Sequence, residues 1–232
     1  MIKDQQSAPQ PATPERPQGA PWTIVLLVAY FAVFVAEVVV FRYFRQDYNV
    51  FNYLSLSRAG LAHGYVWQLV TYQFMHANWV HLFFNGWFIF LFGREMEKCL
   101  GGLKYLVLVF ASGIVGGLFQ FVASILWPGL FGGAVVGASA CAFGLVAAFA
   151  TLYPEEELDL VLLVYPVVLR AKTLFTVFII VGLAGFTFQL GNIAHAAHLG
   201  GMAMGWFYVT KILNLKPAAG SGAPPAPAAG NC

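Results

Sequence analysis

A single serine hydroxyl in a run of small apolar residues is the first group in this sequence that could do chemistry. Ser139 lies within the stretch GASACAFG, which begins at Gly137. A polar group inside a membrane-spanning segment is costly, so it is first interpreted as part of a functional site. The alternative is structural, because a serine in a helix can bond the carbonyl oxygen four residues earlier. Taken alone, the stretch favours the two interpretations about equally.

Two further stretches contain the groups that would turn this serine into a nucleophile. HANWVHLFFN ends at Asn85 and has His81 four positions earlier, and AHAAHLGG contains His198. A serine hydroxyl is a poor nucleophile until a base takes its proton, and histidine is the usual base near neutral pH. The Ser139 backbone N–H, the Asn85 amide and His81 are suitable donors to a tetrahedral oxyanion. These residue types therefore favour acyl transfer by a Ser/His dyad.

The dyad is expected to have no carboxylate as a third member, which makes it a variation on the catalytic triad. Glu37 falls inside the first apolar segment, about a turn and a half before Arg42. We expect its side chain to extend to the membrane interface beside Arg42 or Arg45. The other acidic residues fall in tails and polar loops.

The composition indicates that lipid is the solvent for most of the chain. Apolar residues make up 59% of the 232 residues and charged residues only 9%, and the mean hydropathy is +0.73. A soluble domain of this length could not bury so much apolar surface. The net charge of +2 comes without a basic patch, so we expect the lipid bilayer and no nucleic acid as a partner.

A metal or haem centre is the rival interpretation from another class of protein. It would use four histidines in a redox protein or metal transporter: His76, His81, His195 and His198. The chain lacks the HExxH pattern and has no carboxylate or soft ligand expected at the same depth. The three cysteines are scattered without metal-ligand spacing: Cys99, Cys141 and Cys232. The sequence therefore predicts no metal and no cofactor.

The apolar pattern predicts an all-α integral membrane protein with six spanning helices. Their expected ranges are 22–41, 79–92, 103–126, 133–152, 173–188 and 192–212. The aromatic-rich connection 42–78 should form short elements at the membrane interface. Residues 160–169 are apolar but only about ten residues long, too short to cross, so we expect them to be interfacial as well.

Both chain ends are expected to be tails on the cytoplasmic side. Residues 1–21 are polar and proline-rich, which predicts a disordered tail, and residues 213–232 form a Pro/Ala/Gly-rich flexible tail. One membrane domain, 22–212, lies between them. Nine of the twelve basic residues fall on the side of the termini, so the positive-inside rule makes that side cytoplasmic. No cleavable signal peptide is visible.

Spacing suggests that the three stretches meet. Asn85, Ser139 and His198 each lie six positions in from an expected helix start at the outer face, which is roughly 9 Å below it. Small residues recur every four positions beside two of these groups: Ala140, Gly144 and Ala148 in one span, and Ala197, Gly201 and Gly205 in another. If these seams face each other, the helices can approach closely and bring Ser139 and His198 within hydrogen-bonding distance.

These stretches resemble the rhomboid intramembrane serine proteases. The resemblance rests on GASA from Gly137, HLFFN from His81 and HLGG from His198, with EKCLG after the second span, and it covers about residues 22 to 212. It implies a six-helix rhomboid bundle whose first loop is membrane-associated. It also implies cleavage of membrane-anchored substrates in or near their transmembrane segments, without a cofactor, in a multi-pass protein that we expect in a bacterial inner membrane.

The resemblance also implies roles for individual residues. Ser139 would be the nucleophile and His198 the base, with His81 and Asn85 as oxyanion donors. The supporting residues would be Phe143, packed on the His198 ring, with Gly137 and Gly201, while His76 would be a structural polar residue. Two positions depart from the usual pattern: Gln68 follows Trp67 where many members have arginine, and Ala140 replaces the commoner glycine.

Two alternatives stay open within this interpretation. His195 lies one turn before His198 and could also face inward, but His198 follows the Gly201/Gly205 seam, so we favour it as the base. For His195 a local partner is the more favoured role. The chain could also be an inactive relative that binds membrane clients, although a binder would need neither Ser139 nor His198.

Overall fold

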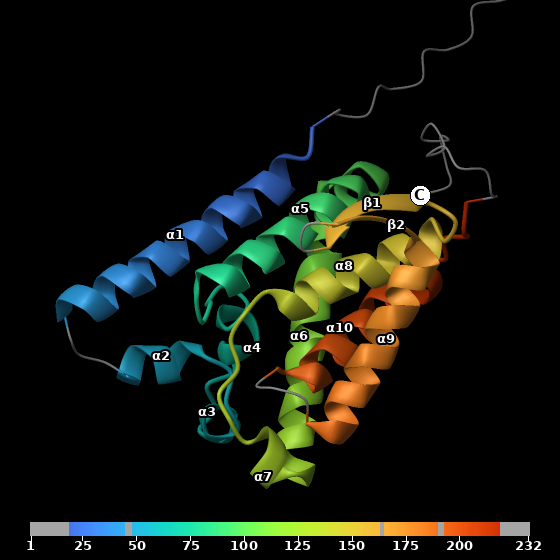
Figure 1. Cartoon of the computed structure of the whole chain (residues 1–232). Coiled ribbons are helices and arrows are strands. Elements are labelled where there is room, and N and C mark those ends of the chain that lie inside the picture. Colours follow the sequence, from blue (N-terminus) through green and yellow to red (C-terminus); the bar gives the residue numbers. More distant parts are fainter. Residues whose placement is uncertain (1–18, 45–47, 163–164, 190–192, 219–232) are drawn as a thin grey trace, which may run out of the picture.

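The computed structural model describes residues 19–44, 48–162, 165–189 and 193–218 (Figure 1). Most of the expected N-terminal tail, residues 190–192 and residues 219–232 of the C-terminal tail lie outside the described residues. The prediction that these tails are disordered or flexible therefore stays a prediction.

The described part of the chain is mostly helical. The longer helices are α1 (Pro21–Phe44), α5 (Trp79–Leu100), α6 (Gly102–Leu126), α8 (Ser139–Leu152), α9 (Ala171–Phe188) and α10 (His195–Phe207), the last continued by a π-helical turn, Tyr208–Ile212. The short helices are α2 (Tyr48–Leu54), α3 (Arg58–Ala62), α4 (Gln68–Thr71) and α7 (Pro128–Phe131). Among the described residues, three helices are long and apolar enough to cross a membrane, within Pro21–Val39, Gly102–Leu126 and Ala171–Phe188.

The centre of the bundle is formed by α6, α8 and α10, with α5 and α9 beside α8 (Figure 1). The two seams of small residues meet there, as the spacing predicts. A methyl group added at Gly201 would lie 2.2 Å from the Ala140 carbonyl oxygen, and one added at Gly205 would lie 2.1 Å from that of Gly144. Because only glycine permits this approach, α8 and α10 pack backbone against backbone.

The expected start of the fourth helix at Gly133 is wrong, because α8 begins at Ser139. The residues before Ser139 form backbone hydrogen bonds with the segment that connects α1 and α5, and they are not helical. Val135 and Leu56 exchange two backbone hydrogen bonds, and the Gly137 amide donates to the Tyr72 carbonyl oxygen at 2.8 Å. Likewise α10 begins at His195, so Ser139 and His198 do not lie six positions into their helices.

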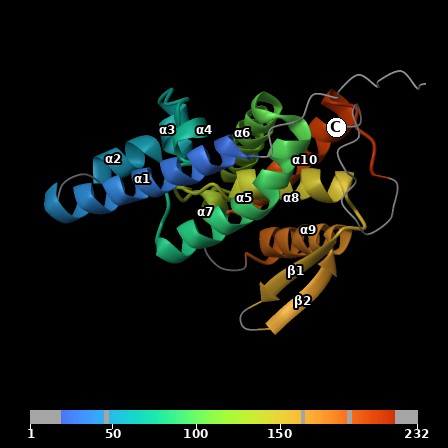
Figure 2. The ribbon, with the colours of Figure 1, turned by 90° about the horizontal axis from the view of Figure 1, so that it is seen from above.

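Residues 160–162 and 165–169, expected to be part of an interfacial segment, belong to two paired β-strands, so the chain is not all-α. The antiparallel strands β1 (Glu157–Leu162) and β2 (Tyr165–Arg170) pair Leu158 with Leu169 and Leu160 with Val167. Apolar residues that alternate along paired strands cover one face of the pair. Leu158 and Leu160 pack against the core, and β2 leads directly into the start of α9 (Figure 2).

Gln68 anchors the connection between α1 and α5. Its side chain is fully buried. The amide Nε2 donates to the Asn52 carbonyl oxygen at 2.9 Å, and Oε1 accepts from the Ser57 amide at 3.1 Å. A neutral side chain with both a donor and an acceptor thus joins two parts of this connection through hydrogen bonds. Tyr72 ties it to α6, because its hydroxyl donates to the Gly113 carbonyl oxygen at 2.6 Å.

Candidate active site

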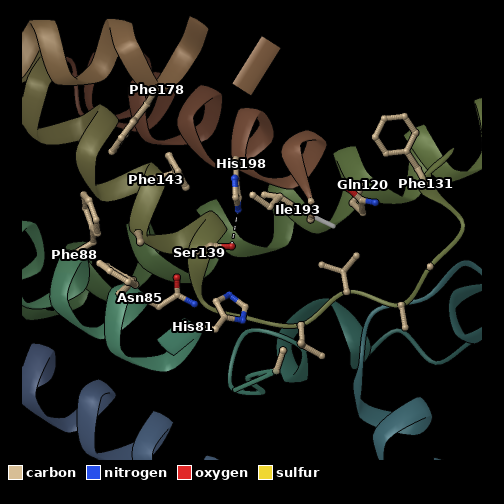
Figure 3. Close-up of a pocket in the computed structure, with 18 of the residues that line it drawn as sticks. His81, Asn85, Phe88, Gln120, Phe131, Ser139, Phe143, Phe178, Ile193 and His198 are labelled. Carbon is tan, nitrogen blue, oxygen red and sulfur yellow. Dashed lines mark hydrogen bonds between the residues drawn. The ribbon is translucent and has the colours of Figure 1, made fainter. Parts of the chain in front are cut away.

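Ser139 and His198 lie within hydrogen-bonding distance although they are 59 residues apart in the chain. The Ser139 Oγ and His198 Nε2 atoms are 2.8 Å apart (Figure 3). Ser139 is the first residue of α8, and His198 lies in the first turn of α10. The close backbone packing of α8 on α10 is what brings the two side chains together. This is the geometry that a serine and its general base require.

Phe143 holds the plane of the His198 ring. The two rings stack with their centroids 4.3 Å apart and an angle of 24° between their planes. Phe143 comes one turn after Ser139 on α8, so one helix supplies both the hydroxyl and the surface on which the imidazole lies. The outer edge of Phe143 contacts Phe178 of α9, with ring centroids 4.9 Å apart.

His195 and His198 face different neighbours. Their ring centroids are 6.1 Å apart, but the His195 side chain is buried against α9. A methyl group added at Gly185 would lie 2.2 Å from the His195 ring. The structure therefore brings His198, and not His195, to Ser139.

His81 and Asn85 line the opposite side of Ser139. Both project from α5, one turn apart, and lie against Gly137, where an added methyl group would be 2.5 Å from the His81 ring and 3.3 Å from Asn85 Nδ2 (Figure 3). Gly137 has φ +122°, a conformation open to glycine but strained for other residues. Asn85 Nδ2 is buried and has no protein partner among the described residues, so its N–H groups are available to a ligand.

These side chains share one pocket of about 830 Å³. Its polar side chains include His81, Asn85, Ser139 and His198, and the apolar part of its wall includes several phenylalanines (Figure 3). Donors and a nucleophile–base pair in an apolar cavity form a site that can stabilise a developing oxyanion away from bulk water.

Gln120 is a pocket residue that the sequence analysis did not identify. It lies on α6, and its Oε1 atom is buried without a hydrogen-bond partner among the described residues. The signal was available, because a glutamine inside an apolar span is as costly as the serine. Gln120 is not part of a recognisable motif, so the sequence alone does not single it out.

Glu37 has a contact that the sequence did not predict. Its Oε2 atom accepts a hydrogen bond from the backbone N–H of His76 at 3.4 Å. The side chains of Arg42 and Arg45, its expected neighbours, lie outside the described residues. A carboxylate therefore lies on the side of the site where His81 is found.

The rival metal site receives no support from side-chain geometry. Over residues 19–44, 48–162, 165–189 and 193–218, no group of three or more His, Cys, Asp or Glu residues is arranged to hold a metal ion. His76 and His81 are close, with ring centroids 5.3 Å apart, but they lie on the side of the pocket opposite His198.

Comparison with known proteins identifies the same segment of the chain. Residues 63–215, about two thirds of the sequence, match the family model described as Rhomboid domain. The chain is 30% identical over 192 residues to rhomboid protease GlpG of Yersinia enterocolitica, covering 82% of this chain and 62% of that protein.

Two eukaryotic relatives match more narrowly. Rhomboid-like protease 1 of Toxoplasma gondii is 32% identical over 66% of this chain and 50% of its own length. Rhomboid protein 1, mitochondrial, of Saccharomyces cerevisiae is 33% identical over 60% of this chain and 40% of its own length. The chain thus spans 40 to 62% of the length of these three relatives.

Proposed function

Because this chain belongs to the rhomboid family, we propose that it is an intramembrane serine endopeptidase that hydrolyses peptide bonds in or near the transmembrane segments of other membrane proteins. The observation that carries the proposal is the 2.8 Å contact between Ser139 Oγ and His198 Nε2 within a pocket. Two of the three relatives described above are named proteases, which agrees with it. An inactive client-binding protein would have no use for this pair.

In the proposed mechanism, His198 Nε2 takes the proton from Ser139 Oγ as the oxygen attacks the scissile carbonyl carbon. The resulting oxyanion accepts hydrogen bonds from the Ser139 backbone N–H, Asn85 Nδ2 and the His81 ring. His198 then gives its proton to the leaving amine, and the C–N bond breaks to leave an acyl-enzyme. Water, deprotonated by His198, attacks this ester, which releases the acid and returns the proton to Ser139.

The chain is an integral membrane protein. We propose that one domain, 22–212, crosses the membrane six times and has a membrane-associated loop between α1 and α5. The tails at 1–21 and 213–232 would both be cytoplasmic. The basic residues favour cytoplasmic termini, in a bacterial inner membrane. Helix α8 supports a site below the outer face: its 14 residues are about 21 Å long, less than the hydrocarbon thickness of about 30 Å.

Substrate must unwind to be cut, because the peptide bonds of a helix in lipid are hydrogen-bonded internally. A pocket that carries hydroxyl, imidazole and amide groups can hydrate and bind the unwound segment. We infer that it opens toward the non-cytoplasmic side and that a transmembrane substrate reaches it between α5 and α9.

The direct test of the proposal is labelling with a fluorophosphonate, which reacts only with an activated serine. We expect labelling of the purified protein at Ser139, mapped by mass spectrometry, and loss of that labelling in His198→Ala. Absence of labelling, with metal or haem present in stoichiometric amount, would support the rival centre instead. Absence of both, with retained binding of single-span proteins, would support the inactive binder.

Replacing Asn85 by alanine should slow cleavage of a single-span reporter protein by about 10- to 1000-fold, the scale for loss of one oxyanion donor. The buried, unpartnered Nδ2 atom is the group that would be lost. The measurement is the initial rate in proteoliposomes at saturating reporter. Asn52→Ala, at an exposed position of α2, serves as the matched control and should leave the rate unchanged. An unchanged rate in Asn85→Ala would mean that its amide does not contact the oxyanion.

Closing the space between α5 and α9 should block membrane substrates while sparing the chemistry. The rings of Phe88 and Phe178 are in contact across it, with centroids 5.7 Å apart. In the double variant Phe88→Cys/Phe178→Cys, we expect a disulfide formed by oxidation to abolish reporter cleavage and leave fluorophosphonate labelling in place. Reductant should restore cleavage, and the single-cysteine variants should not respond to oxidant. Unchanged cleavage by the oxidised double variant would exclude this route of access.

A further inference from the structure

One face of α1 contacts the turn that precedes α5. Tyr30, Phe34 and Glu37 recur at helical spacing on this face. The Phe34 ring meets the Trp79 ring edge-on, with centroids 4.6 Å apart, and the Tyr30 ring lies 5.9 Å from the His76 ring. Packing by the first two residues fixes the face of α1, and therefore the direction in which the Glu37 carboxylate points.

The carboxylate of Glu37 is directed at this turn and accepts a hydrogen bond from it. Oε2 accepts from the His76 backbone N–H at 3.4 Å, and Oε1 is buried without a partner among the described residues. A carboxylate in an apolar helix is expensive, and such residues in membrane helices are functional candidates by default. Packing alone would be served better by an apolar side chain.

His76 links Glu37 to the site, because its backbone contacts Glu37 and its ring contacts His81. Its side chain is 4% exposed, and its Nδ1 atom lies 3.2 Å from the Phe74 carbonyl oxygen, to which it can donate. The His76 ring then lies edge-on to the His81 ring, with centroids 5.3 Å apart and an angle of 67° between their planes. His81 is thus held between His76 on one side and Gly137 on the other.

We propose that Glu37 is a positioning residue for His81, acting through His76. The inference rests on the proposed function, because it assigns Glu37 to the oxyanion side of that same site. Glu37 orients the backbone of the turn at His76, the His76 ring limits the rotation of His81, and His81 stays directed at the pocket. Orienting a donor in advance is what makes oxyanion stabilisation effective.

A pair of near-isosteric variants separates this role from a structural one. Glu37→Gln keeps an oxygen that can accept from the His76 N–H, whereas Glu37→Leu removes the acceptor and suits an apolar helix. We expect Glu37→Leu to lower kcat about 10-fold, as slight misplacement of a catalytic group can do, with KM and the unfolding temperature in detergent unchanged or raised. Glu37→Gln should retain at least half of the wild-type kcat. Glu95→Leu, at an exposed acid on α5 that pairs with Lys98, should match the wild type.

A double-mutant cycle tests whether the effect passes through His81. In a His81→Ala background, Glu37→Leu should cause no further loss of kcat, because the group that it positions is already absent. An equal loss in both backgrounds would overturn the proposal, as would a Glu37→Gln variant no more active than Glu37→Leu, or a Glu37→Leu variant with wild-type kcat. These outcomes can be told apart from failure of the proposed function, in which the wild-type protein itself does not label at Ser139.

Discussion

Ser139→Ala is expected to abolish proteolysis while leaving the fold intact. The hydroxyl is the only atom removed, and its contact in the described structure is with His198 Nε2 at 2.8 Å, so no packing is lost. Loss of a catalytic nucleophile leaves only the contribution of binding and oxyanion donors, and the expected drop in kcat is at least about 1000-fold. The measurement is cleavage of a single-span reporter in proteoliposomes, with the unfolding temperature as the test of fold.

Ser124→Ala is the matched control for this prediction. Ser124 also lies in an apolar helix, α6, but its hydroxyl donates to the Phe121 carbonyl oxygen of its own helix at 2.7 Å. Such back-bonding is the structural role that Ser139 could have had. Ser124→Ala should therefore cleave at the wild-type rate. Turnover by Ser139→Ala near the wild-type rate would remove Ser139 from the mechanism and return it to that structural role.

Gly201→Ala is expected to inactivate the protein through the backbone. Its added methyl group would lie 2.2 Å from the Ala140 carbonyl oxygen, a backbone atom that cannot rotate away. Helices α8 and α10 must then move apart, and the Ser139–His198 contact must lengthen with them. We expect at least about a 100-fold fall in the rate of fluorophosphonate labelling, since misplacement by about 1 Å can cost that much. Labelling by a small probe is the suitable measurement because it does not require substrate access.

The control variant, Gly129→Ala, adds the same methyl group at a position where it contacts no other atom. An added methyl at Gly129, in α7, would meet no atom within 4 Å, so Gly129→Ala should label at the wild-type rate. If Gly201→Ala labelled normally, α8 and α10 could separate without disturbing the pair, and their close packing would not be what holds Ser139 against His198.

The Gly201 and Glu37 variants act on opposite sides of the pocket. Packing of α8 on α10 holds Ser139 near His198, while the contact between α1 and the turn before α5 is proposed to direct His81. We therefore expect Gly201→Ala to reduce the reactivity of Ser139 toward any probe. Glu37→Leu should instead mainly affect reactions that pass through an oxyanion.

The sequence by itself determined the class of protein and the chemical groups of the site. Composition identifies a membrane protein because no soluble fold could bury so much apolar surface. The costs of a serine and two histidines in apolar segments single out Ser139, His81 and His198. The four-residue spacing of Gly201 and Gly205 is local information, and it was enough to predict which helix faces meet.

Tertiary structure alone decided where α8 and α10 begin, that Glu157–Leu162 and Tyr165–Arg170 pair as strands, and what Glu37 contacts. The start of α8 and the contact of Glu37 depend on hydrogen bonds between segments far apart in the chain. Val135 bonds Leu56, and Gly137 bonds Tyr72, so α8 starts at Ser139 rather than at Gly133. Apolar periodicity reports burial along one segment but not which distant carbonyl or amide will satisfy its backbone. For that reason the groups of the site and the start of α5 could be predicted from sequence, whereas the starts of α8 and α10 could not.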